Sequence, residues 1–278
     1  METFDADWLT LREPADGRAR DGSLPERLCD AWRRRGWTRV VDLGSGTGSN
    51  LRYLAPRMPP GQRWTLVDHD PRHVDQLRRL EAPPAVDAVS AVSRDLAADG
   101  LAVVAGANLV TASALLDLVS ESWLAELVRR CSDAACGAYF ALTYDGEVRW
   151  MRESAGGWRV DSDLDDGLVR TAVNRHQRSD KGFGPALGPA GAPLAARLFE
   201  EAGYRTWLAG SAWRLEAPDR RLTDRLVEGW AAAAAELRPE AADRIAAWAA
   251  RRRAALARGG FRVTVGHRDL LALPGDAE

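Results

Sequence analysis

The sequence contains almost no lysine. Of its 38 basic residues only Lys181 is a lysine, and the arginines are interleaved with 40 acidic residues, which leaves a formal net charge of −2. Such a mixture gives no broad positive field, so nucleic acid is not a favoured partner. The arginine runs 33–35 and 251–253 are expected to lie near the ends of helices, where cations interact favourably with the helix dipole.

Long apolar runs are absent as well. No stretch approaches the roughly 20 apolar residues of a membrane-spanning helix. The first seven residues carry acids rather than the basic residues of a signal peptide. We therefore expect a cytoplasmic protein without membrane contact. The three cysteines, Cys29, Cys131 and Cys136, have no metal-site spacing and are expected to be reduced, buried thiols.

Apolar residues are still numerous enough for a substantial core. Hydrophobic residues make up 46% of the 278 positions. No internal repeat or low-complexity linker divides the chain. We therefore expect a single domain over residues 1–278.

A glycine-rich turn directly follows a short apolar stretch at residues 39–43. Three glycines, Gly44, Gly46 and Gly48, allow a tight turn that approaches a ligand without a Cβ atom in between. Their spacing does not fit the dinucleotide-binding pattern G-x-G-x-x-G, because no glycine stands at the required sixth position. The pattern is instead an acid, Asp42, followed by three alternating glycines. A helix is expected next, with its first amides directed at a polar ligand group.

Two further apolar stretches end in acids. Residues 63–67 end at Asp68, which lies 24 positions beyond Gly44. An acid at the carboxyl end of the second strand can bind both hydroxyls of a ribose. Residues 86–92 lead in the same way to Asp95. Three acids, Asp42, Asp68 and Asp95, therefore stand at or just beyond the ends of three successive predicted strands.

These motifs resemble those of the class I S-adenosylmethionine (SAM)-dependent methyltransferases over roughly the first half of the chain. The resemblance implies that the glycine loop passes under the methionine part of the cofactor. It implies that Asp42 helps to hold the ammonium group, which requires a carboxylate partner, and that Asp68 binds the ribose. Arg12 or Arg20 could reach the methionine carboxylate, although ordinary surface arginines fit the sequence about as well. The cofactor-binding residues so implied are Asp42, Gly44, Ser45, Gly46, Gly48, Asn50, Asp68, His69, Asp95, Leu96, Ser113 and Arg20.

The resemblance and the alternation of strands with helices predict an α/β fold. We expect a Rossmann-like seven-stranded sheet of six parallel strands plus an antiparallel last strand, with helices on both faces. Asp70, which precedes a proline, is interpreted as the N-cap of the helix after the second strand. Three segments exceed this plan: an N-terminal arm at 1–22, a lid insertion after strand 5 at 146–191, and a helical hairpin before strand 7 at 218–260. The hairpin is expected to serve packing or a dimer surface, so a homodimer is one expected assembly.

Methyl transfer from a sulfonium is an in-line displacement, so the protein mainly holds donor and acceptor in line. A base is needed only where the acceptor loses a proton. The candidates are Asp117, after the fourth strand, and His176 in the predicted lid, for which a surface position is the competing interpretation. His73 is expected on the outer face of its helix, and His267 in the last strand without a partner. Acceptor contacts are expected from Tyr144, Arg175, Arg178, Lys181 and Trp213.

The expected function is therefore SAM-dependent methyl transfer to a small-molecule acceptor. Arginine, histidine and lysine gather within residues 175–181, which suits a polar or acidic acceptor. A protein or RNA methyltransferase is the alternative, but residues 113–116 lack the Asn-Pro-Pro-Tyr-like tetrad of many such enzymes. A non-catalytic SAM-binding relative is the third candidate. No metal-ligand pattern can be picked out among the scattered acids, and metal assistance and the attacking atom (N, O, C or S) both stay open.

Overall fold

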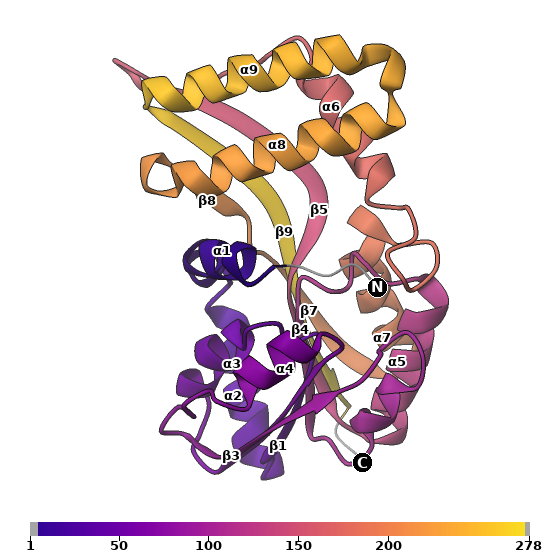
Figure 1. Cartoon of the computed structure of the whole chain (residues 1–278). Coiled ribbons are helices and arrows are strands. Elements are labelled where there is room, and N and C mark those ends of the chain that lie inside the picture. The colour runs from indigo at the N-terminus through magenta and orange to yellow at the C-terminus, as the bar shows by residue number, and fades with distance from the viewer. Residues whose placement is uncertain (1–4, 276–278) are drawn as a thin grey trace.

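The computed structural model describes residues 5–275, which form a central sheet with helices on both faces (Figure 1). The strands are β1 (Arg39–Leu43), β2 (Gln62–Asp68), β3 (Val86–Ser93), β4 (Leu109–Ser113), β5 (Gly137–Ser154), β6 (Gly157–Val160), β7 (Tyr204–Gly210), β8 (Trp213–Leu215) and β9 (Phe261–Pro274). The helices are α1 (Ala6–Ala19), α2 (Ser23–Arg35), α3 (Ser49–Leu54), α4 (Pro71–Leu77), α5 (Glu121–Asp133), α6 (Asp166–His176), α7 (Gly191–Glu201), α8 (Arg220–Leu237) and α9 (Ala242–Arg258). Within 5–275, no helix has both the length and the apolar content to cross a membrane.

The sheet runs in the order β3-β2-β1-β4-β5-β9-β7, with β6 added beside β5 and β8 beside β9. β1 pairs in parallel with β2 and β4, whereas β9 lies antiparallel between β5 and β7. The predicted six parallel strands and antiparallel last strand are confirmed. The predicted sixth strand is broken in two, because β7 ends at Gly210 and β8 pairs with a different stretch of β9. In this order the carboxyl ends of β1, β2 and β4 meet at one edge.

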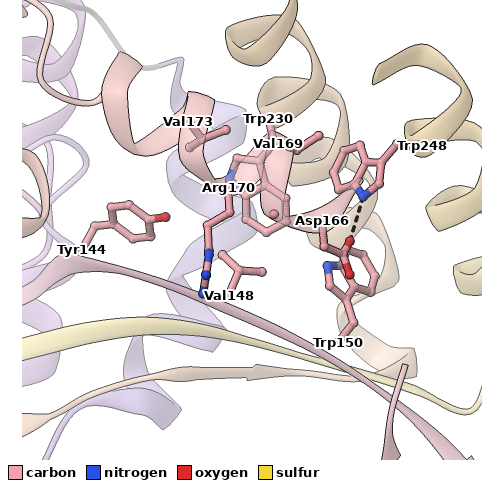
Figure 2. A pocket seen from close by; sticks show the side chains of 10 residues that line it. Tyr144, Val148, Trp150, Asp166, Val169, Arg170, Val173, Trp230 and Trp248 are labelled. Carbon is pink, nitrogen blue, oxygen red and sulfur yellow. Dashed lines mark hydrogen bonds between the residues drawn. The ribbon is translucent and has the colours of Figure 1, made fainter. Parts of the chain in front are cut away.

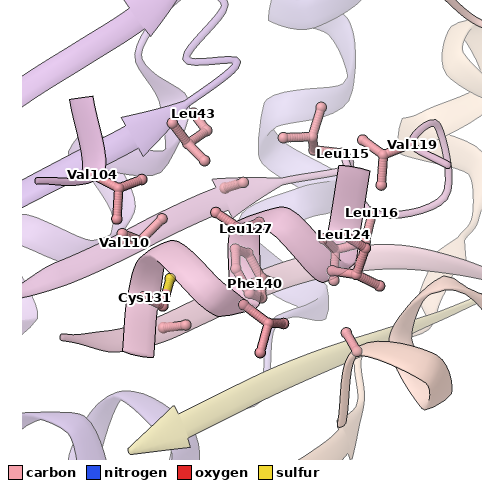
Figure 3. Close-up of a cluster of buried hydrophobic side chains, with 14 of the residues drawn as sticks. Leu43, Val104, Val110, Leu115, Leu116, Val119, Leu124, Leu127, Cys131 and Phe140 are labelled. Carbon is pink, nitrogen blue, oxygen red and sulfur yellow. The ribbon is translucent and has the colours of Figure 1, made fainter. Parts of the chain in front are cut away.

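Two apolar layers cover the two faces of the sheet. On one face α5 and α7 pack over β4 and β5, where Leu124, Leu127 and Phe140 are buried (Figure 3). On the other face α2, α3 and α4 pack through side chains such as Leu51 and Leu77. The three cysteines are buried free thiols, as the sequence predicts. These layers hold the strand ends rigidly in place, which a binding site on loops requires.

Strand β5 is long, and it runs beyond residue 146, where the sequence predicts that a lid insertion begins. It continues to Ser154 and pairs with β9 and β6, so that β5 and β9 rise beyond the sheet in Figure 1. Val148 and Trp150 point to the core and Arg149 to solvent, which is the alternation of a half-buried strand. The first part of the expected lid, from residue 146, is therefore sheet. The helix α6 follows it.

This extension has a hydrophobic core of its own. α1, α6, α8 and α9 pack on it, and Trp213, Trp248 and Phe261 are among its buried side chains. The predicted helical hairpin is present as α8 and α9, which cover the extension in Figure 1. The extension therefore adds a third packed layer, beyond the two that flank the sheet.

An arginine and carboxylate cluster ties α9 to the start of α6. Arg251 and Arg252 of α9 donate hydrogen bonds to four carboxylates: Asp161, Asp163, Asp165 and Asp166. Arg252 is only 3% exposed and its guanidinium also lies 4.4 Å from the centre of the Trp150 ring. The expected role of run 251–253 at a helix end is thus replaced by direct pairing with acids.

Candidate active site

A cavity opens at the edge where β1, β2 and β4 end. Six of the twelve residues predicted to bind the cofactor line it: Gly44, Gly46, Asp68, His69, Leu96 and Ser113. They come from three different strand ends and one turn, which the sheet order brings together. The site therefore lies where a parallel sheet of this order places ligands.

The glycine loop adopts backbone conformations that favour glycine. The φ angles of Gly44, Gly46 and Gly48 are +67°, +52° and +84°. A Cβ added to Gly46 would lie 2.9 Å from a methyl carbon of Leu9, so helix α1 covers the loop closely. A Cβ on Gly48 would meet Leu80 at 2.8 Å, on the side away from the cavity. Gly48 thus serves packing, while Gly44 and Gly46 form the cavity wall.

A buried polar network lies behind the loop. The Asn50 amide donates to Asp42 Oδ1 and to Thr111 Oγ1, both at 2.7 Å. The Arg20 guanidinium donates to Asn50 Oδ1 at 2.6 Å and to Ser113 Oγ at 3.0 Å. Within residues 5–275, Asp42 Oδ2 and Arg20 Nε have no hydrogen-bond partner although both are buried. Burial raises the pKa of the Asp42 carboxyl to about 6, and the hydrogen bond from Asn50 offsets part of that rise.

Asp68 sits at the centre of the cavity edge. Its Oδ2 accepts from the Gly46 amide at 2.7 Å and its Oδ1 from the Asp70 amide at 2.9 Å. The Nδ1 atoms of His73 and His69 lie 3.5 and 3.7 Å from Asp68 Oδ1. The expected outer position of His73 is wrong, because the residue is 6% exposed and lines the cavity. Asp70 caps α4 through the Arg72 amide, as predicted.

The turn after β3 is built from one exposed and one buried residue. Asp95 is exposed, and its Oδ1 accepts from the Ala97 amide at 2.9 Å. Leu96 is buried and its carbonyl accepts from the Trp123 indole at 2.6 Å. Leu96 therefore contributes apolar wall, and Asp95 stands beside the cavity.

A second cavity of about 240 Å³ adjoins the first. Both cavities are lined by Arg12, Ala114, Leu118 and Lys181. Five residues predicted for catalysis or acceptor binding line the second one: Asp117, Tyr144, His176, Lys181 and Trp213. We call the first the cofactor cavity and the second the acceptor cavity.

Two predicted acceptor contacts lie elsewhere. Arg175 and Arg178 are exposed and neither is among the residues that line these two cavities. In the same segment, His176 lies 3.5 Å from Glu236 of α8, and its Nδ1 lies 3.4 Å from the Lys181 ammonium. The end of α6 and the turn after it therefore present His176 and Lys181 toward the cavity, and Arg175 and Arg178 toward solvent.

Helix α1 forms the wall between the two cavities. Arg12 donates to Asp16 Oδ2 at 2.9 Å, and its guanidinium lies 5.0 Å from the centre of the Trp213 ring. The Trp213 indole in turn donates to Asp16 Oδ1 at 2.9 Å. The expected arm is thus a docked helix in which Arg12 faces the acceptor side and Arg20 reaches the buried network.

No protein-family model matches the sequence, and no curated protein sequence matches it significantly. Solved structures do match. The chain is similar to YjhP from E. coli, with 14% identity, 95% of this chain and 100% of that chain covered, and a TM-score of 0.43. It is similar to the cyclopropane synthase MmaA2 from Mycobacterium tuberculosis, with 10% identity, 97% and 94% covered, and a TM-score of 0.47. A third is the N-terminal domain of EvdMO1 with SAH bound, with 17% identity, 68% and 74% covered, and a TM-score of 0.40.

These identities are all below 25% and the scores below 0.5, so the fold class rests on the chain's own topology. An antiparallel strand between the last two parallel strands, beside a glycine loop after β1, is the arrangement that the sequence resemblance implies. The chain has a Rossmann-like fold of six parallel strands and an antiparallel β9, as the resemblance implies. Two further features distinguish the walls of these cavities.

The first is backbone strain at the cavities. Ala114 and Leu142 have φ angles of +53° and +57°, which non-glycine residues rarely adopt. Ala114 follows β4 and lines both cavities, and Leu142 lines the acceptor cavity from β5. The Leu142 amide donates to the buried Asp269 at 2.8 Å, where the pairing of β5 with β9 is irregular. Strained residues of this kind cluster at functional sites.

The second is His267, which sequence reasoning left without a role. It is 6% exposed, lines the acceptor cavity, and lies 4.8 Å from the Trp213 ring and 6.2 Å from the Tyr144 ring. Within residues 5–275 its Nδ1 has no hydrogen-bond partner. Burial, together with the charge of Arg12, lowers the pKa of His267 to about 3. The position of His267 beside Tyr144 follows from the antiparallel register of β5 and β9, which the sequence alone does not give.

Proposed function

We propose that this protein transfers a methyl group from SAM to a small-molecule acceptor. The observation that carries the proposal is the junction of two cavities at Arg12, Ala114, Leu118 and Lys181. One cavity has the glycine loop and strand-end acid of a nucleoside site, and the other offers room for an acceptor. A transfer between two bound molecules needs this adjacency.

The residues of the cofactor cavity, together with the buried polar network behind it, fit SAM. A buried carboxylate oxygen without a partner on Asp42 suits the methionine ammonium, and the buried Arg20 suits the methionine carboxylate. Asp68 uses one hydrogen bond on each oxygen, which leaves lone pairs for the ribose hydroxyls. When bound, SAM supplies an activated methyl group on a sulfonium. The chain's own residues then bind SAM and the acceptor, align them for transfer, and exclude water.

The acceptor cavity combines aromatic walls with cations. Trp8, Trp213 and Trp230 line it, and Arg12 and Lys181 lie at the end nearest the cofactor cavity. Stacking surfaces beside cations suit a planar, polar or acidic molecule. We infer that such a molecule is the acceptor. A cavity lined from α1, α6, α8 and β9 favours a small molecule over a protein or RNA chain.

Three side chains can orient the attacking group of the acceptor or take up its proton. His267 is neutral at pH 7, and its buried Nδ1 can accept a hydrogen bond from an acceptor hydroxyl. Asp117 and His176 line the same cavity and remain the predicted catalytic candidates. We propose that His267 orients the attacking group, while Asp117 or His176 takes up the proton.

The test of this function is methyl transfer itself. The purified full chain is incubated with SAM labelled on the methyl group and with pools of small aromatic acids and phenols. We expect label to appear in at least one pool at a rate proportional to enzyme. Tight SAM binding without label transfer in any pool would favour a non-catalytic relative. Label found only in added protein or RNA would contradict the small-molecule assignment.

A further inference from the structure

A third cavity, of about 190 Å³, lies inside the extension. Figure 2 shows its side chains reaching in from β5 and from the helices above it. Three tryptophans line it, Trp150 from β5, Trp230 from α8 and Trp248 from α9, together with Val148 and Val169. We call it the inner cavity. Except for Tyr144, the residues that line it belong to the predicted lid insertion or to the predicted helical hairpin.

The charged side chains on this wall already have hydrogen-bond partners in the protein. Asp166 accepts from the Trp248 indole at 2.8 Å and from Arg252 at 3.1 Å. Arg170 donates to Glu147 at 2.9 Å. The buried polar atoms that lack a partner, within residues 5–275, include none from the lining of the inner cavity. Most of the remaining wall is aromatic or aliphatic, so an apolar guest fits.

The inner cavity shares a wall with the acceptor cavity. Tyr144, Val173 and Trp230 line both, so the partition is one layer of side chains thick. The Tyr144 hydroxyl donates to Asn174 of α6 at 2.9 Å, and Asn174 donates to the Gly146 carbonyl at 3.0 Å. Figure 2 shows the Tyr144 hydroxyl directed toward the other side chains that line the inner cavity. The three cavities thus follow one another from the glycine loop to the helical hairpin.

The volume of the inner cavity indicates the size of its guest. An apolar cavity of about 150 Å³ stays dry and binds benzene. The inner cavity is slightly larger than this, so it holds one aromatic ring or a branched alkyl group of similar size. Gly167 and Arg170 on its wall are exposed, so the cavity also approaches the surface beside α6.

We propose that the methyl acceptor is amphipathic: its polar head lies in the acceptor cavity, and an apolar group about the size of one ring lies in the inner cavity. This rests on the proposed function, and it adds the chemical class of the acceptor. The inner cavity then determines specificity for the acceptor. An acceptor without the apolar group does not gain the favourable free energy of burying that group. Tyr144 stands between head and apolar group.

The test uses two probes that differ by one ring. Benzoate supplies a carboxylate head alone, and 4-benzylbenzoate adds a ring on a flexible carbon. Each is titrated by calorimetry into the full chain, with and without S-adenosylhomocysteine. We expect 4-benzylbenzoate to bind wild-type protein at least tenfold more tightly than benzoate. Equal affinities for the two probes would overturn the proposal.

Two variants locate the added ring. Val169→Phe fills the inner cavity, and we expect it to reduce the advantage of 4-benzylbenzoate to less than twofold with benzoate unchanged. Gly167→Phe narrows the same cavity from α6. An added Cβ there meets no atom within 4 Å, so we expect this variant to fold even if Val169→Phe does not. The matched control is Gly229→Phe in α8, which has equally open space and lines only the acceptor cavity. It should weaken both probes alike.

The outcomes separate the two proposals. If the advantage persists in both Val169→Phe and Gly167→Phe, the ring binds elsewhere and the inner cavity is not part of the acceptor site. Failure of S-adenosylhomocysteine to bind counts against the proposed function alone, because the titrations without it still compare the two probes.

Discussion

At the scale of single residues, the most informative feature is a carboxyl group that burial has made easy to protonate. Asp42 is 1% exposed, and its pKa is raised to about 6 by burial. Because the folded-state pKa lies above the usual value, the proton binds preferentially to the folded protein between about pH 4 and 6. The carboxylate that a methionine ammonium needs is thus lost as the pH falls through 6.

The first prediction follows for SAM affinity. At pH 5 only about a tenth of Asp42 is ionised, so SAM should bind roughly tenfold more weakly than at pH 7.5. Calorimetric titration at both pH values measures this change. In Asp42→Asn the affinity should be weak at both values and should differ by less than about twofold. An equal pH response in wild type and variant would show that another group titrates.

His267 gives the second prediction, which concerns stability. Its pKa falls from 6.5 to about 3 on folding, so the unfolded chain binds the proton first as the pH drops. Folding stability is therefore lost between pH 6.5 and 3. Between pH 7 and 5 the wild type should lose on the order of 2 kcal/mol more than His267→Phe, by urea unfolding. Equal losses would mean that the imidazole is not buried in solution.

The same variant tests the role of His267 in transfer. His267→Phe keeps an aromatic ring against Trp213 and Tyr144 but removes the ring nitrogen that is proposed to orient the acceptor. We expect labelled-methyl transfer to fall by about tenfold or more, with SAM affinity within about twofold of wild type. Unchanged transfer would leave proton handling to Asp117 and His176.

At the scale of elements, the β5–β9 extension is the part of the fold whose secondary structure local sequence patterns do not predict. Val148, Arg149 and Trp150 carry the alternation of a strand, but the glycines around them favour a loop. The pairing with β9, more than 100 positions later in the chain, decides the outcome. Strand β5 therefore runs on, and α6 docks on it through contacts that no local pattern encodes.

The segment after α6 gives the third prediction, with a control from the same turn. Lys181 lines both cavities, whereas Arg178 is exposed and lines neither. Lys181→Ala should lower methyl transfer by about tenfold or more, because a cation near the reacting groups helps to orient a polar acceptor. Arg178→Ala should change it by less than about twofold, as expected of an exposed charge. Similar losses in both would mean that the segment acts through its fold alone.

Closure of this segment over the acceptor stays a prediction. Hydrogen exchange over residues 165–184 should slow when cofactor and an acceptor are both bound, as a closing lid requires. Unchanged exchange in the ternary complex would indicate a wall that is already in place.

At the scale of the whole molecule, the cofactor half could be predicted from strand order, whereas the acceptor half could be predicted only in part. The sequence indicated Asp117, Tyr144, His176, Lys181 and Trp213, but not the other residues that complete the acceptor cavity from α1, α8 and β9. Asp42, Asp68 and the glycines follow strands that any parallel sheet gathers at one edge, so their positions follow from order and spacing. The acceptor cavity is assembled from Trp8, Trp230 and His267, which lie on α1, α8 and β9. Their meeting depends on packing between distant elements, and the sequence holds no motif for it.

The central claim is that SAM binds at the edge formed by β1, β2 and β4, and its most direct test is a titration of SAM into Asp68→Ala beside Asp70→Ala. Both remove a buried carboxylate two positions apart, but only Asp68 lines the cofactor cavity. Removal of Asp68 should cost about 1.5–3 kcal/mol of binding, or roughly ten- to a hundredfold in affinity. Removal of the Asp70 cap should lower stability by about 1 kcal/mol and leave SAM affinity within about twofold. Wild-type affinity in a folded Asp68→Ala variant would place the cofactor elsewhere and contradict the account.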